Sequence, residues 1–91
     1  MLDVRILDEA QRFLDGLPEK HRYQIVRKIM LLAEHPYTAR TKSIEGFPPL
    51  RRIKSGDYRI IYFVEGDVLK VPLIDKRGND AVYRRLKRLF G

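Results

Sequence analysis

Two Gly-Asp pairs, spaced ten residues apart, constrain the fold of the second half of the chain more than any other feature. Gly56-Asp57 and Gly66-Asp67 both lie between runs of apolar and β-branched residues, a pattern typical of hairpin turns. They predict three consecutive antiparallel strands, at about residues 50–54, 57–65 and 67–73. The run 58–64 is apolar at both parities, which indicates a central strand covered by helices on one face and partly on the other. Pro72 removes one ladder donor, so it predicts an edge position or a bulge late in the last strand.

The first half of the chain reads as a short strand followed by two helices. Residues 2–7 predict the strand, and Asp8 is a suitable N-cap for the first helix. In that helix the residues with helical spacing are Ala10, Phe13, Leu14 and Leu17. Gly16 and Pro18 bracket the break, and Pro18 suits the first turn of a second helix that ends before Pro36. The second helix carries a wide apolar face made of Tyr23, Ile25, Val26, Ile29, Met30, Leu32 and Ala33.

These elements predict an α+β fold for a single domain spanning residues 1–91. The short break between the helices implies a helical hairpin packed on one face of a small antiparallel sheet. Residues 36–49 hold three prolines and read as a loop. Asn79 or Asp80 can cap a final helix, whose narrow apolar stripe is Val82, Leu86 and Leu89. The expected order is therefore β-α-α-β-β-β-α.

Positive charge is concentrated in the second half of the chain. The formal net charge is +7, and residues 1–49 carry 8 Lys+Arg against 7 Asp+Glu, whereas residues 50–91 carry 11 against 5. Such one-sided charge predicts an anionic partner, either nucleic acid or an acidic protein, or both. The alternative is that the basicity serves solubility alone.

Several classes of site are disfavoured by composition. The chain has no cysteine, which excludes disulfide frameworks, cysteine zinc sites and thiol nucleophiles. His21 and His35 lack a second ligand at metal spacing, and the carboxylates are scattered, so neither a metal site nor a cofactor is expected. No apolar run is long enough to span a bilayer and no secretion leader is visible, so we expect a cytoplasmic protein with no membrane partner.

The remaining candidates for chemistry are cations and tyrosines. Arg52 and Lys54 share one face of a predicted strand, and Arg59 follows the turn that folds the next strand beside them. RNA can be cut without a metal, because its own 2′-hydroxyl can attack the adjacent phosphorus. Arg and Lys side chains can stabilise the extra charge of the phosphorane, and a tyrosine can exchange a proton or stack on a base. Each side chain taken singly is more typical of a solvated strand cation or a packed tyrosine.

Three segments resemble the RelE family of toxins from bacterial and archaeal toxin–antitoxin pairs, within the wider RelE/ParE superfamily. They are GDYRIIYFV, LIDKRGNDAVYRRL and AQRFLDGLPEKHRYQIVRKI. The resemblance implies a RelE-like fold and a metal-independent endoribonuclease that enters the ribosomal A site, cuts mRNA there and inhibits translation. It also implies an acidic, RelB-like antitoxin as the partner, besides the ribosome with its rRNA and the mRNA.

The resemblance assigns the catalytic set residue by residue. Its members are Arg52, Lys54, Arg59, Arg77 and Tyr83. Guanidinium hardly deprotonates in proteins, so we expect Arg77 to act mainly by its charge rather than as a general acid. The cations expected to contact RNA or the ribosome are Arg40, Lys42, Arg51, Lys76, Arg84, Arg85, Lys87 and Arg88.

Two alternatives to RNA cleavage stay open. One is a ParE-like inhibitor of DNA gyrase, which shares the fold but generally lacks the late arginine and tyrosine. The other is a basic module that binds RNA or an acidic protein without catalysis. Relatives that use histidine as acid or base are disfavoured, because no histidine follows residue 35.

Overall fold

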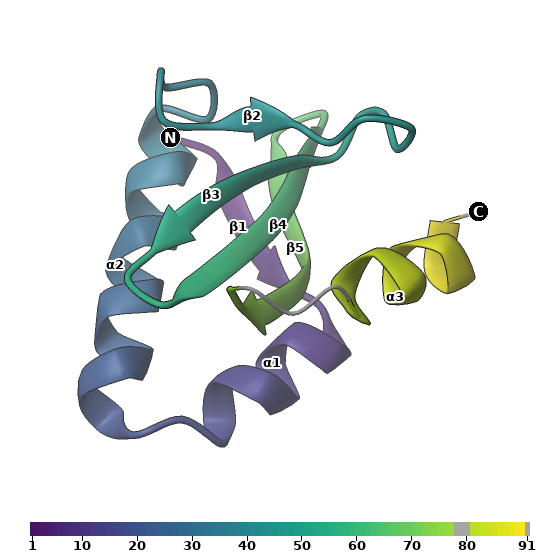
Figure 1. Cartoon of the computed structure of the whole chain (residues 1–91). Helices are drawn as coiled ribbons and strands as arrows, with labels where there is room; N and C mark the ends of the chain where they lie inside the picture. Colours follow the sequence, from purple (N-terminus) through teal and green to yellow (C-terminus); the bar gives the residue numbers. More distant parts are fainter. Residues whose placement is uncertain (78–80, 91) are drawn as a thin grey trace.

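A mixed five-stranded sheet, in the order β1-β5-β4-β3-β2, organises the chain (Figure 1). The computed structural model describes residues 1–77 and 81–90, with the backbone alone described for 81–83. The strands are β1 (Asp3–Ile6), β2 (Lys42–Ser43), β3 (Arg51–Ser55), β4 (Tyr58–Glu65) and β5 (Val68–Lys76). The helices are α1 (Asp8–Asp15), α2 (Glu19–Glu34) and α3 (Ala81–Phe90). The predicted α+β fold is confirmed, with two additions described below.

Both Gly-Asp turns form as predicted. Ser55 pairs with Tyr58 and Glu65 pairs with Val68, so each turn has two central residues. Gly56 has φ of 59° and Gly66 has φ of 60°, which a residue with a side chain rarely adopts. A left-handed glycine at the first central position is the signature of a type II′ turn, whose twist suits an antiparallel hairpin.

Pro72 lies at a bulge in an inner strand. The β4–β5 pairing shifts register between Ile61, which faces Leu73, and Phe63, which faces Lys70. The extra residue on β5 is accommodated where Pro72 lacks its N–H donor. The bulge alternative is therefore confirmed and the edge alternative is wrong, since β5 lies between β1 and β4. The strand also continues to Lys76, beyond the predicted end at residue 73.

Two strand pairings were not expected from the sequence. β1 joins the sheet parallel to β5, with Val4 opposite Leu69 and Ile6 opposite Val71. The segment 36–49 is not loop throughout, because β2 pairs with β3 over two residues. A strand this short has no readable periodicity; it is held by the turn that follows, where the Ile44 N–H donates to Leu50 O at 3.0 Å.

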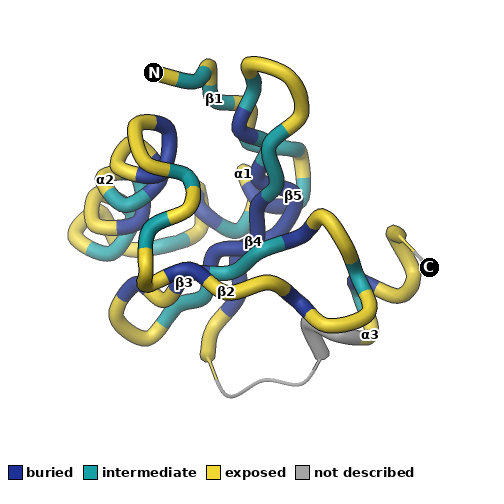
Figure 2. Tube along the Cα trace, turned by 90° about the horizontal axis from the view of Figure 1, so that it is seen from above, coloured by how far each residue is buried: buried dark blue, intermediate teal, exposed yellow. Residues whose placement is uncertain are grey.

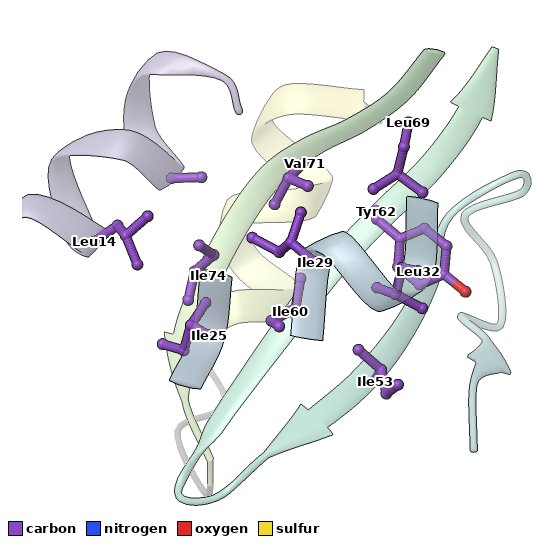
Figure 3. Packing of buried hydrophobic residues seen from close by; sticks show 11 residues of the cluster. Leu14, Ile25, Ile29, Leu32, Ile53, Ile60, Tyr62, Leu69, Val71 and Ile74 are labelled. Carbon is purple, nitrogen blue, oxygen red and sulfur yellow. The ribbon is translucent and has the colours of Figure 1, made fainter. Parts of the chain in front are cut away.

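Helices α1 and α2 cover one face of the sheet and bury the main core. Figure 3 shows Ile25, Ile29 and Leu32 of α2 above Ile60 and Tyr62 of β4. The apolar face of α2 is narrower than predicted: Tyr23 is 62% exposed and Met30 is 42% exposed. Figure 2 shows the same alternation of buried and exposed residues around α2. The two helices meet at an open angle rather than side by side (Figure 1).

The helix ends differ from the predicted caps by one residue. Asp8 is the first residue of α1, Leu7 occupies the N-cap, and no side chain caps the helix. Asp8 still lies where a negative charge interacts favourably with the helix dipole. Pro18 is the N-cap of α2 rather than part of its first turn.

Helix α3 packs on the opposite face of the sheet. Leu86 is fully buried there, in a second apolar cluster with Ile44, Leu50, Ile61 and Leu73. Leu89 is 52% exposed, so the predicted apolar stripe is wrong at that position. The Val82 side chain and the Asn79 or Asp80 cap lie outside the described residues. Within the described part of the chain, no helix is long and apolar enough to cross a membrane.

Candidate functional site

The alternation of side chains along β3 and β4 places Arg52, Lys54 and Arg59 on the face of the sheet where α3 packs. Ile53 and Ile60 face each other on the helix-covered side, in the main core. Because side chains alternate along a strand, Arg52, Lys54 and Arg59 point to the opposite side. Lys54 and Arg59 are directly paired across β3 and β4. The expectation that Arg59 folds back beside the β3 cations is therefore met by the register.

These cations converge on a cleft of about 410 Å³. Leu86 of α3 packs on Ile61 and Leu73, a cross-strand pair that lies two residues further from the β3–β4 turn than the pair Arg59 and Asp75. Among the residues that the structure describes, the lining consists of Ile53 and six cations: Arg40, Lys42, Arg52, Lys54, Arg59 and Arg77.

The β3–β4 turn holds Arg77 at the cleft. The Arg77 backbone N–H donates to Asp57 O at 2.7 Å, and its guanidinium Nη1 donates to Gly56 O at 3.2 Å. The two contacts bring a residue beyond the end of β5 against a turn 20 residues earlier in the chain. Four of the five predicted catalytic side chains therefore line one cleft. The fifth, that of Tyr83, lies outside the described residues, although its backbone belongs to the first turn of α3.

Arg51, one of the cations predicted to contact RNA or the ribosome, does not line the cleft. It has the parity of Ile53, so it points to the other side of the sheet. Its guanidinium donates to Thr41 Oγ1 at 2.8 Å and to Ser43 Oγ at 3.0 Å, and lies 5.2 Å from the centre of the Tyr37 ring. These contacts fasten the β2 segment to β3, which positions Arg40 and Lys42 at the cleft.

The remaining predicted binding cations lie outside the cleft lining. Arg84, Lys87 and Arg88 are exposed on α3. Arg85 is half-buried, and its Nε lies 3.7 Å from Glu9 Oε1 of α1. Lys76 is exposed at the end of β5 and pairs with Tyr58, so it has the parity of the helix-covered face. The four α3 cations and Lys76 therefore belong to different faces of the sheet.

Asp75 is a buried carboxylate beside a cation of the cleft, and the sequence did not single it out. It pairs with Arg59 across β4 and β5 and is only 4% exposed. Its Oδ1 accepts a hydrogen bond from the Lys76 N–H at 2.7 Å, whereas Oδ2 has no hydrogen-bond partner among the residues that the structure describes. The available signal was its spacing of two from Leu73, which puts it on the same side of β5 as the α3 cluster.

A second hollow, with charges of both signs, lies on α2. It is an open depression of about 660 Å³ along α2, lined by Glu19, Lys20, Arg22, Tyr23 and Val26. Its charges are of both signs, so it offers no concentrated field for an anion. Among residues 1–77 and 81–90, no three His, Asp or Glu side chains gather as a metal site, and His21 packs edge-on against Tyr58.

The chemistry that the basic cleft suits is binding of a phosphate group. Guanidinium and ammonium groups on adjacent strands are held in fixed relative positions, and charge-assisted hydrogen bonds to phosphate are the strongest available to such side chains. A cluster of this kind also stabilises a phosphorus centre that gains negative charge during a reaction.

Comparison with known proteins identifies a family for this fold and site. Residues 4–81 match the family model described as the ParE toxin of the type II toxin–antitoxin system parDE. Comparison with curated protein sequences finds no significant match. Several solved structures share the fold, and two are described here.

The archaeal RelE–RelB complex from Pyrococcus horikoshii is 27% identical to the chain, covers 86% of this chain and 97% of that chain, and has a TM-score of 0.74. A mutant of the E. coli toxin RelE in its free state is 24% identical, covers 98% of both chains, and has a TM-score of 0.81. The second likeness is one of fold alone, while the family match extends over most of the sequence.

Proposed function

The chain belongs to the ParE toxin family of type II toxin–antitoxin systems, within the RelE/ParE superfamily, and we propose that this toxin is a ribosome-dependent endoribonuclease that cuts mRNA in the A site. The observation that carries the proposal is the convergence of Arg52, Lys54, Arg59 and Arg77 on one cleft. Inhibition of translation would be the consequence of cleavage.

The proposed reaction is attack of the substrate's 2′-hydroxyl on the adjacent phosphorus. In this scheme Tyr83 takes the hydroxyl proton as the general base. The new O–P bond forms as the bond to the 5′-oxygen breaks. Arg52, Lys54 and Arg59 stabilise the phosphorane. The leaving oxygen gains its proton through water or a ribosomal group, and the products end in a 2′,3′-cyclic phosphate and a 5′-hydroxyl.

Arg77 contributes charge in this scheme rather than a proton. A guanidinium stays protonated at any pH the ribosome tolerates, so it is a poor proton donor. Its contact with Gly56 O fixes its position relative to β3 and β4, which favours an electrostatic role at the phosphate. The ribosome supplies what the small cleft lacks, namely alignment of the mRNA for in-line attack.

The proposed partners follow from charge and from the relatives. An acidic antitoxin suits a basic chain of this family, and the Pyrococcus horikoshii relative was solved as a complex of RelE with RelB. Ribosome binding is assigned to the exposed cations of α3, Arg84, Lys87 and Arg88, with contributions from Arg85 and Lys76. Arg40 and Lys42 are assigned to mRNA, because they line the cleft.

Inhibition of DNA gyrase is the second candidate. The matching family model is described as the ParE toxin, and a gyrase inhibitor would need the same fold without a catalytic step. A basic module without catalysis would lack both activities. The basic cleft favours RNA cleavage over both alternatives, because gyrase inhibition demands no convergence of cations around one phosphate.

One experiment with two readouts tests the proposal. Purified toxin is mixed with mRNA-programmed ribosomes and, separately, with gyrase and relaxed plasmid. We expect mRNA cleavage at the A site, no inhibition of supercoiling, and a large loss of cleavage in Arg59→Ala. Arg5→Ala is the matched control, because Arg5 is an exposed strand arginine on β1, at the edge of the sheet opposite to β2. Intact mRNA together with blocked gyrase would replace the proposal by the second candidate.

A further inference from the structure

The Asp75 carboxylate lies beneath the basic cleft and has no role in the mechanism proposed above. It does not belong to the cleft lining, and it is 4% exposed. The register places it directly opposite Arg59, which does line the cleft. Opposed residues on antiparallel strands have their Cβ atoms about 5 Å apart, within reach of an arginine fork. Asp75 is thus a buried acid adjacent to a cation of the site.

Only one of the two Asp75 carboxylate oxygens accepts a hydrogen bond within the described part of the chain. Oδ1 accepts the N–H of Lys76 at 2.7 Å. Oδ2 is buried without a hydrogen-bond partner in the described part of the chain. Burying a carboxylate oxygen without a partner is costly, and native proteins seldom do so without a reason. Asp75 Oδ2 can therefore accept a further hydrogen bond, and the neighbouring cleft is lined by Arg and Lys side chains that can donate one.

We propose that Asp75 is a positioning residue for Arg59: when an anion enters the cleft, the Arg59 guanidinium donates to Asp75 Oδ2 from one edge and to the anion from another. A guanidinium has five donors in a planar fork, so it can bridge a carboxylate and a phosphate. A carboxylate behind the fork limits its rotation and aims the remaining donors into the cleft. The inference rests on the proposed function for the identity of the anion as RNA, but not for the geometry.

The alternative role of Asp75 has the opposite consequence. If the carboxylate only offset the repulsion among the cations, removing its charge would make the cleft more positive and tighten anion binding. If it aims Arg59, removing its charge loosens the arginine and weakens binding. The sign of the change in affinity therefore separates the two roles.

The test uses a short single-stranded RNA with methylated 2′-hydroxyls, which binds but cannot be cut. Its affinity for the free toxin is measured by fluorescence anisotropy at one fixed salt concentration. Asp75→Asn preserves an acceptor for the Lys76 N–H and removes the charge. We expect this substitution to weaken RNA binding about fivefold, which corresponds to the loss of a modest charge-assisted hydrogen bond. Asp67→Asn is the matched control, since it makes the same charge change at the exposed β4–β5 turn, and its affinity should stay at the wild-type value.

A double-mutant cycle shows whether Asp75 acts through Arg59. In an Arg59→Ala background, Asp75→Asn should cause no further loss, whereas in an Arg40→Ala background it should cause the same fivefold loss. Equal or tighter binding by Asp75→Asn, or full additivity with Arg59→Ala, would overturn the inference.

A measurement on the wild-type protein guards against misfolding of the variant. The ¹³C signal of the Asp75 carboxyl should shift when the methylated RNA is added, and the Asp67 signal should not. An unchanged Asp75 signal at saturation would also overturn the inference. A cleavage assay on ribosomes distinguishes failure of the proposed function from failure of this inference. If wild-type toxin binds the methylated RNA as expected but leaves ribosomal mRNA intact, the result refutes RNA cleavage and leaves the positioning role of Asp75 standing.

Discussion

At the scale of single residues, the proposed reaction divides the work between groups that supply charge and a group that moves a proton. Arg52, Lys54, Arg59 and Arg77 are assigned the binding and stabilisation of the phosphate. The proton transfer is assigned to Tyr83. Substitutions that preserve shape and remove one chemical function are therefore the informative ones.

Tyr83→Phe tests the proton transfer. The substitution keeps the ring and its stacking, but removes the hydroxyl. We expect the single-turnover rate of cleavage on the ribosome to fall by roughly 10²–10⁴-fold, the range for loss of a general base, with ribosome affinity nearly unchanged. Tyr23→Phe, at a tyrosine that is 62% exposed on α2, is the matched control. Cleavage by Tyr83→Phe at the wild-type rate would remove Tyr83 from the chemistry.

Residue-level prediction from the sequence succeeded where strand alternation alone decides direction. Arg52, Lys54 and Arg59 reach a common face because one face of β3 and β4 is already committed to Ile53 and Ile60. It did not identify the partners of Arg51, because Thr41 and Ser43 lie beside or within β2, a strand too short to predict. It also missed Asp75, because its neighbour across the sheet depends on a register that the bulge near Pro72 shifts.

At the scale of elements, Leu86 is the deeply buried anchor among the α3 side chains that the structure describes. Leu86 is fully buried between α3 and the sheet, while Leu89, one turn later, is 52% exposed. We expect Leu86→Ala to lower the free energy of unfolding by about 2–5 kcal/mol, from lost transfer energy and the cavity left behind. Leu89→Ala should lower it by less than about 1 kcal/mol. Urea denaturation of both variants measures the difference, and equal losses would mean that α3 does not rely on the second apolar cluster.

The exposed cations of α3 allow a second test at the scale of elements, because they do not line the cleft. Arg84→Ala combined with Arg88→Ala should weaken ribosome binding and flatten its dependence on salt, since fewer counterions are released. The rate of cleavage by the bound toxin should change little. Arg85 is left intact in this variant, because it lies near Glu9 and its loss would also disturb α1. An equal loss of the bound-state rate would show that α3 contributes to chemistry as well as docking.

Elements with strong local signals were predictable, and those made by tertiary contacts were not. The two Gly-Asp turns fix the hairpins through backbone conformations that glycine adopts most easily. In contrast, β2 exists because Arg51 and the Ile44–Leu50 turn hold two residues against β3. The parallel pairing of β1 with β5 joins residues more than 60 positions apart, and no local pattern encodes such a contact.

At the scale of the whole molecule, the fold places most cations of the second half of the chain on one side of the sheet. The face covered by α1 and α2 carries the main core, together with Arg51 and Lys76. The other face carries the cleft and α3, and α3 lies across the sheet from α2 (Figure 1). A net charge of +7 on 91 residues attracts polyanions, so a chain of this kind suits an acidic partner.

The last prediction concerns that partner, an acidic antitoxin. We expect an extended or helical acidic segment to fold on binding and to cover the cleft, including Arg52 and Arg59. Opposite charges steer the encounter, so the association rate should fall steeply between low and physiological ionic strength, while the dissociation rate changes little. Stopped-flow fluorescence over a salt series measures both. A crystal structure of the complex that leaves Arg52 and Arg59 exposed would contradict direct masking of the cleft. The antitoxin would then inhibit by blocking entry of the toxin to the ribosome. In that case the cleavage rate of toxin already bound to the ribosome should not change with antitoxin concentration.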